Sequence, residues 1–139
     1  MNDDIIVGID LGTTNSCIGI WRNYNFEIIP DRFGNHTIPS IVAFGSYTTY
    51  IGNEAKNQTI INPENTIYEI KRLIGRDFND NIVQNYLEYL TYSVNELDSR
   101  LIINTNTKTL SPEEISAYIL RELKLMALQY LKLDINTTL

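Results

Sequence analysis

The sequence predicts a mixed α/β protein of the α+β kind, with antiparallel strands and helices packed on them. Two apolar strand-type runs, residues 5–9 and 17–21, flank a short polar segment, which is typical of a hairpin. Further strand-type runs follow, and a long amphipathic pattern near the end predicts a helix. With 139 residues, 43% of them hydrophobic, the chain suits one domain or part of one.

The first half of the chain predicts strands before helices. Residues 26–29 form a third strand after the hairpin, so a three-stranded meander is expected. A loop at residues 30–37 precedes a strand at 38–44, which we expect to pair with residues 47–51.

Three helical segments follow these strands. Residues 52–59 predict a short helix. Residues 64–74 predict a second one, because Ile67, Ile70 and Ile74 recur at helical spacing. Asn65 or Thr66 would cap this helix and Gly75 would end it. Residues 79–90 predict a third helix.

The last third predicts a small set of strands and then the strongest helix. Strands are expected at residues 91–94, 101–104 and 108–110. Ser111 and Glu114 form a capping box, and Pro112 takes the first helical position. The helix is expected to run to Leu131 with these residues on its apolar face: Ile115, Ile119, Leu120, Leu123, Met126, Ala127, Tyr130 and Leu131.

Composition narrows the possible partners. The net charge of −6 disfavours nucleic acid as a main partner, because phosphate backbones select basic surfaces. No apolar run is long enough to span a bilayer, and the acidic start does not resemble a leader, so we expect a cytoplasmic protein without a membrane partner. The single cysteine, Cys17, is expected to be buried as a small apolar residue.

The polar segment of the hairpin suits a phosphate ligand. Glycine lets the backbone approach a ligand closely, and a row of main-chain N–H groups seats phosphate oxygens. A carboxylate beside such a seat favours Mg²⁺ or its water shell. The same residue types are also ordinary turn chemistry, and that interpretation stays open at this point. The residues concerned are Asp10, Gly12, Thr13, Thr14, Asn15 and Ser16.

Six short motifs resemble, in the same order, those of the Hsp70 chaperones. The first, Gly-Ile-Asp-Leu-Gly-Thr-Thr-Asn-Ser from Gly8 to Ser16, is similar to the first phosphate loop of that family. Matches in one order over most of a chain are far more specific than one loop. The chain is therefore identified as a member of the Hsp70 family, within the actin-like ATPase superfamily. The other motifs are residues 34–40, 52–56, 62–66, 71–76 and 112–116.

The resemblance implies the ribonuclease H-like fold of actin-like ATPases, with this chain forming the first lobe only, and incompletely. It implies ATP or ADP and Mg²⁺ as ligands. Asp10 would contact Mg²⁺ through its water shell. Lys71 would reach the γ-phosphate and stabilise the transferring group, although a lysine near a helix end is ordinarily a solvated charge. Asp10 and Lys71 would be the catalytic residues, and the β- and γ-phosphate oxygens would be held by Gly12, Thr13, Thr14 and Asn15.

By resemblance, residues 1–139 are an N-terminal fragment of an Hsp70 nucleotide-binding domain without a peptide-binding domain. Residues 1–38 would form the meander with its phosphate loop, 39–110 an inserted subdomain, and 111–133 the long helix. The second phosphate loop and the adenosine pocket would lie outside the chain. We therefore expect weak or no ATP binding and no measurable turnover, and exposed sheet edges that favour self-association.

Three functions remain open from the sequence. The chain could be the nucleotide-binding region of an ATP-hydrolysing chaperone, with nucleotide as its partner. It could be a non-catalytic interaction module that binds co-chaperones or a full-length Hsp70. It could also be a decayed remnant without a selected role. Retention of Asp10, the Gly-Thr-Thr run and Lys71 together favours recent truncation or retained nucleotide contact over long decay.

Overall fold

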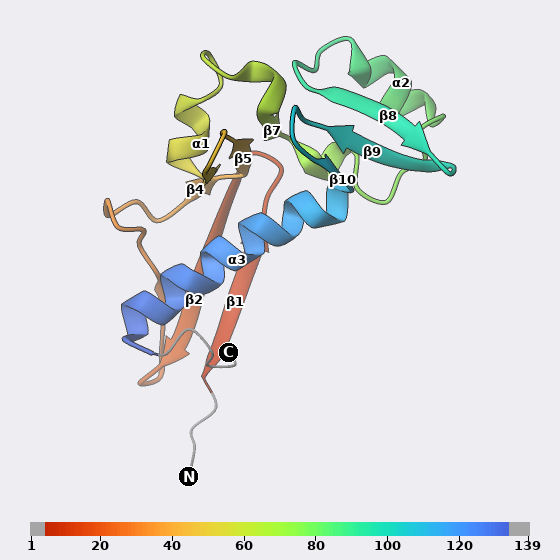
Figure 1. Cartoon of the computed structure of the whole chain (residues 1–139). Helices are drawn as coiled ribbons and strands as arrows, with labels where there is room; N and C mark the ends of the chain where they lie inside the picture. Colours follow the sequence, from red (N-terminus) through yellow and green to blue (C-terminus); the bar gives the residue numbers. More distant parts are fainter. Residues whose placement is uncertain (1–4, 134–139) are drawn as a thin grey trace.

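The computed structural model describes residues 5–133, which form three small antiparallel sheets joined by a long helix (Figure 1). The first sheet has the order β1–β2–β3, and the short strand β4 also pairs with β2. The predicted meander is confirmed. Its strands are β1 (Ile6–Leu11), β2 (Asn15–Arg22), β3 (Asn25–Ile28) and β4 (Ile38–Pro39).

The other two sheets lie beyond the upper end of the first one in Figure 1. One has the order β6–β5–β7 and the other β10–β9–β8, and all their pairings are antiparallel. The expected pairings of β5 with β6 and of β9 with β10 are confirmed. The strands are β5 (Ile41–Phe44), β6 (Thr49–Ile51), β7 (Thr66–Tyr68), β8 (Ser93–Leu97), β9 (Arg100–Asn104) and β10 (Thr109–Leu110).

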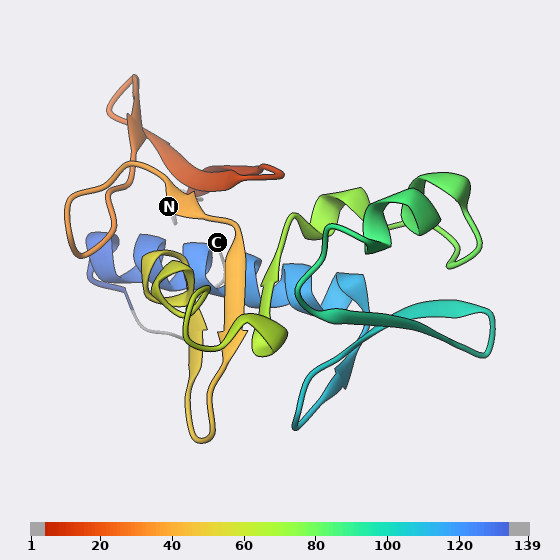
Figure 2. The same cartoon turned by 90° about the horizontal axis from the view of Figure 1, so that it is seen from above.

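Helix α3 (Pro112–Leu131) connects the three sheets. It starts at the β8–β10 sheet, passes β5 and β6, and then crosses one face of the first sheet (Figures 1 and 2). The predicted cap is confirmed, because the Ser111 side chain accepts a hydrogen bond of 3.1 Å from the backbone N–H of Glu114. At the other end, Tyr130 donates to the Glu27 carboxylate of β3 over 2.8 Å, which fixes the helix on the sheet.

Two further helices are short and confirm the prediction: α1 (Asn53–Asn57) and α2 (Asn81–Leu87). The helix predicted over residues 64–74 is wrong. That stretch contains two single turns, η1 (Pro63–Asn65) and η2 (Ile70–Arg72), on either side of strand β7. Neither Asn65 nor Thr66 provides the predicted N-cap: Asn65 is the last residue of η1 and Thr66 follows it. Gly75 ends no helix, because it comes after η2.

The reason for this difference is long-range pairing. The β-branched residues Thr66 and Ile67 pair with Ala43 and Val42 of β5, and both are fully buried. Burial in a sheet between distant segments outweighs helical spacing, which is a weak local preference. Glu69 then adopts a left-handed conformation with φ 52°, which breaks any helix across this position.

The two faces of the first sheet differ sharply. Ile18 and Ile20 of β2 are buried against α3, on the face shared with Val7 and Ile9 of β1. The opposite face is not covered within the described residues 5–133. It exposes Ile6 (66%), Trp21 (56%) and Phe26 (51%), which are neighbours across the three strands.

Cys17 belongs to this second face and corrects the expectation of a buried residue. It is only partly buried and lies directly opposite Asp10 in the β1–β2 ladder. The run of apolar residues in β2 is continuous, so its sequence does not tell which face each residue takes. Among the described residues, no helix is long and apolar enough to cross a membrane.

Candidate functional site

The turn between β1 and β2 is a tight main-chain structure. A Cβ atom on Gly12 would lie 2.0 Å from the carbonyl oxygen of Asn15, so the backbone closes there in a way that only glycine allows. Gly12 and Thr13 are partly buried, and Thr14 and Asn15 are exposed. The turn therefore offers hydroxyl, amide and main-chain groups to solvent at one end of the sheet.

Asp10 lies at the upper end of β1, close to this turn, and is exposed. Residues directly opposite each other in an antiparallel ladder share a face, so Asp10 and Cys17 point to the same side of the sheet. No group of three or more potential metal ligands occurs among residues 5–133. One exposed carboxylate suits contact with Mg²⁺ through the water that this ion retains, and it does not suit a protein cage.

Lys71 is the central residue of η2 and is exposed. Its position follows from three neighbours: Ile70 and Leu73 are buried on either side, and Glu69 holds a left-handed conformation just before the turn. The Glu69 carboxylate accepts from Arg72 over 2.9 Å and also from the hydroxyl of Tyr86. Burial and the adjacent Glu69 carboxylate both raise the pKa of Tyr86, so this hydroxyl remains a donor at neutral pH.

Both views place the β1–β2 turn beside the η2 segment, which follows β7 in the chain (Figures 1 and 2). The predicted residues thus occur in two segments at the same end of the first sheet. The assignment of Asp10, Gly12, Thr13, Thr14, Asn15 and Lys71 as site residues stays a prediction.

Two buried serines, Ser16 and Ser40, support the turn. The sequence already placed Ser16 in the polar segment, but sequence reasoning missed Ser40 as a site residue. The Ser40 hydroxyl donates to the carbonyl oxygen of Gly12 over 2.9 Å and lies 2.7 Å from the Ser16 hydroxyl. The backbone N–H of Ser40 donates to the carbonyl oxygen of Thr14 over 2.9 Å. No local spacing signals such a contact, since 28 residues separate Ser40 from Gly12.

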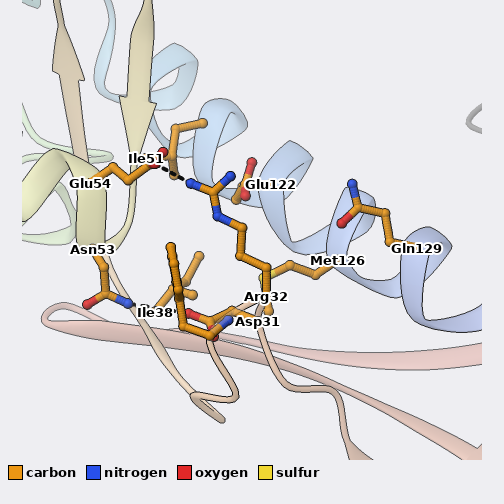
Figure 3. Close-up of a pocket in the computed structure, with 10 residues that line it drawn as sticks. Asp31, Arg32, Ile38, Ile51, Asn53, Glu54, Glu122, Met126 and Gln129 are labelled. Carbon is orange, nitrogen blue, oxygen red and sulfur yellow. Dashed lines mark hydrogen bonds and ion pairs between the residues drawn. The ribbon is translucent and has the colours of Figure 1, made fainter.

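The chain also has a hollow of about 240 Å³ between α1, α3 and the loop after β3 (Figure 3). Figure 3 shows the Arg32 side chain reaching across it to pair with Glu54, with Glu122 nearby. Its floor is apolar, formed by Ile38, Ile51 and Met126. None of the six predicted site residues lines this hollow, so it is separate from the turn.

Two carboxyl groups in this hollow have pKa values shifted in opposite directions. Burial raises the pKa of Glu122, and the neighbouring Glu54 raises it further, against an opposing effect of Arg32. At Asp31, burial acts to raise the pKa, but hydrogen bonds from Asn35, Phe33 and Asn53 outweigh it and lower the pKa.

The family model described as "Hsp70 protein" matches residues 6–139, which is nearly the whole chain. The chain belongs to the Hsp70 family. The resemblance of the six motifs is thereby confirmed, and the mixed α/β structure fits a partial lobe of an actin-like ATPase.

Curated Hsp70 relatives are similar over 94% of this chain. Heat shock cognate 70 kDa protein 3 of Dictyostelium discoideum is 46% identical, and the match covers 22% of its length. Heat shock 70 kDa protein of Neurospora crassa is 44% identical, with 21% of its length covered. Heat shock protein 70 homolog of Acanthamoeba polyphaga mimivirus is 43% identical, with 15% covered.

The chain thus spans about a fifth or less of the length of these Hsp70 proteins. It corresponds to part of the nucleotide-binding region of the family, whose members are nucleotide-binding ATPases.

Proposed function

We propose that this chain is a nucleotide-binding segment of an Hsp70-type chaperone, and that the β1–β2 turn binds the phosphate chain of ATP or ADP with Mg²⁺. The observation that carries the proposal is the closed turn at Gly12, where the backbone leaves no room for a side chain. Such turns present N–H groups to anions. In the family, ATP binding and hydrolysis are coupled to protein folding.

Each predicted residue has one role in this proposal. The backbone and side chains from Gly12 to Asn15 would hold β- and γ-phosphate oxygens. Asp10 would hold water molecules of a bound Mg²⁺, which itself would neutralise the phosphate charge. Lys71 would place a positive charge against the terminal phosphate from the neighbouring η2 segment.

The proposal concerns the phosphates more than the base. Residues 5–133 form five hollows, one of which is shown in Figure 3. None of the six predicted site residues lines any of these five hollows. The turn is open to water, where electrostatic contacts are weak. We therefore expect millimolar affinity for Mg-ATP and no measurable hydrolysis by residues 1–139 alone.

The test is a titration of the 139-residue chain with Mg-ATP, followed by ¹H–¹⁵N spectra of the backbone amides. We expect fast-exchange shifts at Thr13, Thr14 and Asn15, with a dissociation constant of about 1 mM. Shifts confined to other parts of the chain would refute the phosphate role. A micromolar dissociation constant for Mg-ATP, measured by calorimetry, would refute the expected millimolar affinity.

A second candidate function rests on the uncovered face of the first sheet. Three large apolar side chains, Ile6, Trp21 and Phe26, are more than half exposed there, next to the edge of β1 that no strand among residues 5–133 pairs with. Apolar patches and free edges favour association. We infer from this face the alternative of a non-catalytic module, which binds a full-length Hsp70 or a co-chaperone.

This alternative has its own experiment. Trp21→Ser and Phe26→Ser should abolish co-sedimentation of the chain with a purified Hsp70, or self-association in light scattering, without changing amide shifts at the turn. The exposed Tyr47, far along the chain, supplies the matched control Tyr47→Ser. If the wild-type chain is monomeric and does not bind Hsp70, the proposed role as an interaction module is refuted.

A further inference from the structure

The contacts of Ser40 form a directed chain of hydrogen bonds beneath the phosphate-binding turn. A serine hydroxyl has one proton, and that of Ser40 goes to the carbonyl oxygen of Gly12 at 2.9 Å. The hydroxyl of Ser16, 2.7 Å away, must then donate to Ser40. Both serines are almost fully buried, with exposed fractions of 2% and 1%. Chained hydrogen bonds strengthen one another in such surroundings.

These contacts also decide where the N–H groups of the turn point. In a planar trans peptide, the C=O and the following N–H point in opposite directions. Ser40 holds the carbonyls of Gly12 and Thr14 towards itself. The N–H groups of Thr13 and Asn15 therefore point away from Ser40, and Gly12, which has no side chain, restricts the rotation of its peptide less than any other residue would.

Ser40 also connects the turn to the segment that carries Lys71. Ile41, the next residue, starts β5 and pairs with Tyr68 of β7. Lys71 follows Tyr68 by three positions in the chain. The paired strands β5 and β7 thus connect the turn to the segment that carries Lys71. Ser40, which directly precedes β5, makes the hydrogen bonds to the turn.

We propose that Ser40 is a positioning residue for phosphate binding: through its hydroxyl and its amide it keeps the N–H groups of Thr13 and Asn15 turned outward, in fixed relation to η2. The inference rests on the proposed function, because the outward N–H groups matter only if a phosphate is bound there. Ser16 supports Ser40 through the 2.7 Å contact between the two hydroxyls.

The test compares Ser40→Ala with a matched control in the 139-residue chain. Ser116→Ala also removes a buried serine hydroxyl (4% exposed) that donates to a backbone carbonyl, here that of Pro112 at 3.0 Å within α3. With magnesium pyrophosphate as the probe, S40A should bind about three- to ten-fold more weakly than wild type. S116A should bind as wild type does.

A second measurement needs no ligand. The S40A variant should lower the ¹H–¹⁵N heteronuclear NOE of Thr13 and speed hydrogen exchange of the backbone amide at position 40. S116A should change neither quantity. Ser16→Ala should give a smaller effect in the same direction. If S40A does not fold, Ser40→Cys replaces the hydroxyl with a somewhat larger thiol, which is only a weak donor, and carries the same expectation.

The outcomes separate the two proposals. Unchanged Thr13 dynamics and unchanged pyrophosphate affinity in S40A would overturn the positioning role. A wild-type chain that shows no pyrophosphate shifts would reject the phosphate role. In that case the dynamics of Thr13 alone would decide whether Ser40 orders the turn.

Discussion

The Cβ position of Gly12 lies 2.0 Å from the carbonyl oxygen of Asn15, so the two residues are in contact through backbone alone. A real Cβ atom cannot occupy that position, and a backbone oxygen cannot move aside as a flexible side chain would. The turn is therefore specified by the absence of a side chain, at the same point where it would meet a phosphate.

Gly12→Ala should accordingly destabilise the chain by about 1–3 kcal/mol, because the turn must open to admit the methyl group. Urea unfolding followed by circular dichroism measures this loss. Gly8→Ala is the matched control: it lies in the same strand pair, has no atom within 4 Å of its Cβ position, and should be nearly neutral. Equal losses in the two variants would contradict a specific closure at Gly12.

Cys17 provides a reporter for the same region. It is the only cysteine of the chain, is partly exposed, and lies opposite Asp10 on one face of the ladder. Magnesium pyrophosphate bound at the turn should block access beside Asp10 and slow alkylation of Cys17 by iodoacetamide. Mass spectrometry gives the rate. The Asp10→Asn variant should lose this protection, and protection that persists in it would place the ligand elsewhere.

Asp31 and Glu122 predict opposite effects of pH on stability. The pKa of Asp31 is lowered from its ordinary value of 3.8, mainly by hydrogen bonds that outweigh burial. Ionised Asp31 thus stabilises the fold above that value, and this contribution disappears as the pH falls through the folded-state pKa. Asp31→Asn should be less stable than wild type at neutral pH and should approach it in acid.

The pKa of Glu122 is raised above its ordinary value of 4.5, first by burial. Neutral Glu122 therefore stabilises the fold fully below 4.5, and that contribution is lost as the pH rises through the folded-state pKa. Glu122→Gln, which stays neutral, should be at least as stable as wild type at neutral pH, with no difference below 4.5. Urea unfolding across the pH range tests both variants. If the stability difference from wild type changed with pH in the same direction for Asp31→Asn and Glu122→Gln, the predicted opposite effects would be disproved.

Local signals predicted much of this fold. The hairpin follows from two apolar runs around a polar turn. Helix α3 follows from its capping box and from the spacing of Ile115, Ile119 and Leu123, all of which are fully buried. In each case neighbouring residues carry the information, because hydrogen bonds close within a few positions.

What could not be predicted depends on distant partners. Strand β7 forms because it pairs with β5, and no sequence pattern between residues 64 and 74 indicates that partner. Ser40 supports a turn 28 residues earlier, through contacts that no motif spacing encodes. For the candidate site, the sequence nominates the residues of the turn, whereas the support by Ser40 becomes visible only in the coordinates.

Lys71 permits the sharpest test of the proposed site, because it is exposed and its loss should not affect stability. Lys71→Ala should weaken magnesium pyrophosphate binding about three- to ten-fold at low ionic strength, because the variant lacks the ammonium group that attracts the phosphate. The difference should shrink as salt is added, because screening removes the same attraction from wild type. Lys124→Ala, an exposed lysine on α3, is the control and should bind normally. If both variants bind equally well, Lys71 does not face the bound phosphate, and the turn then acts without the η2 segment.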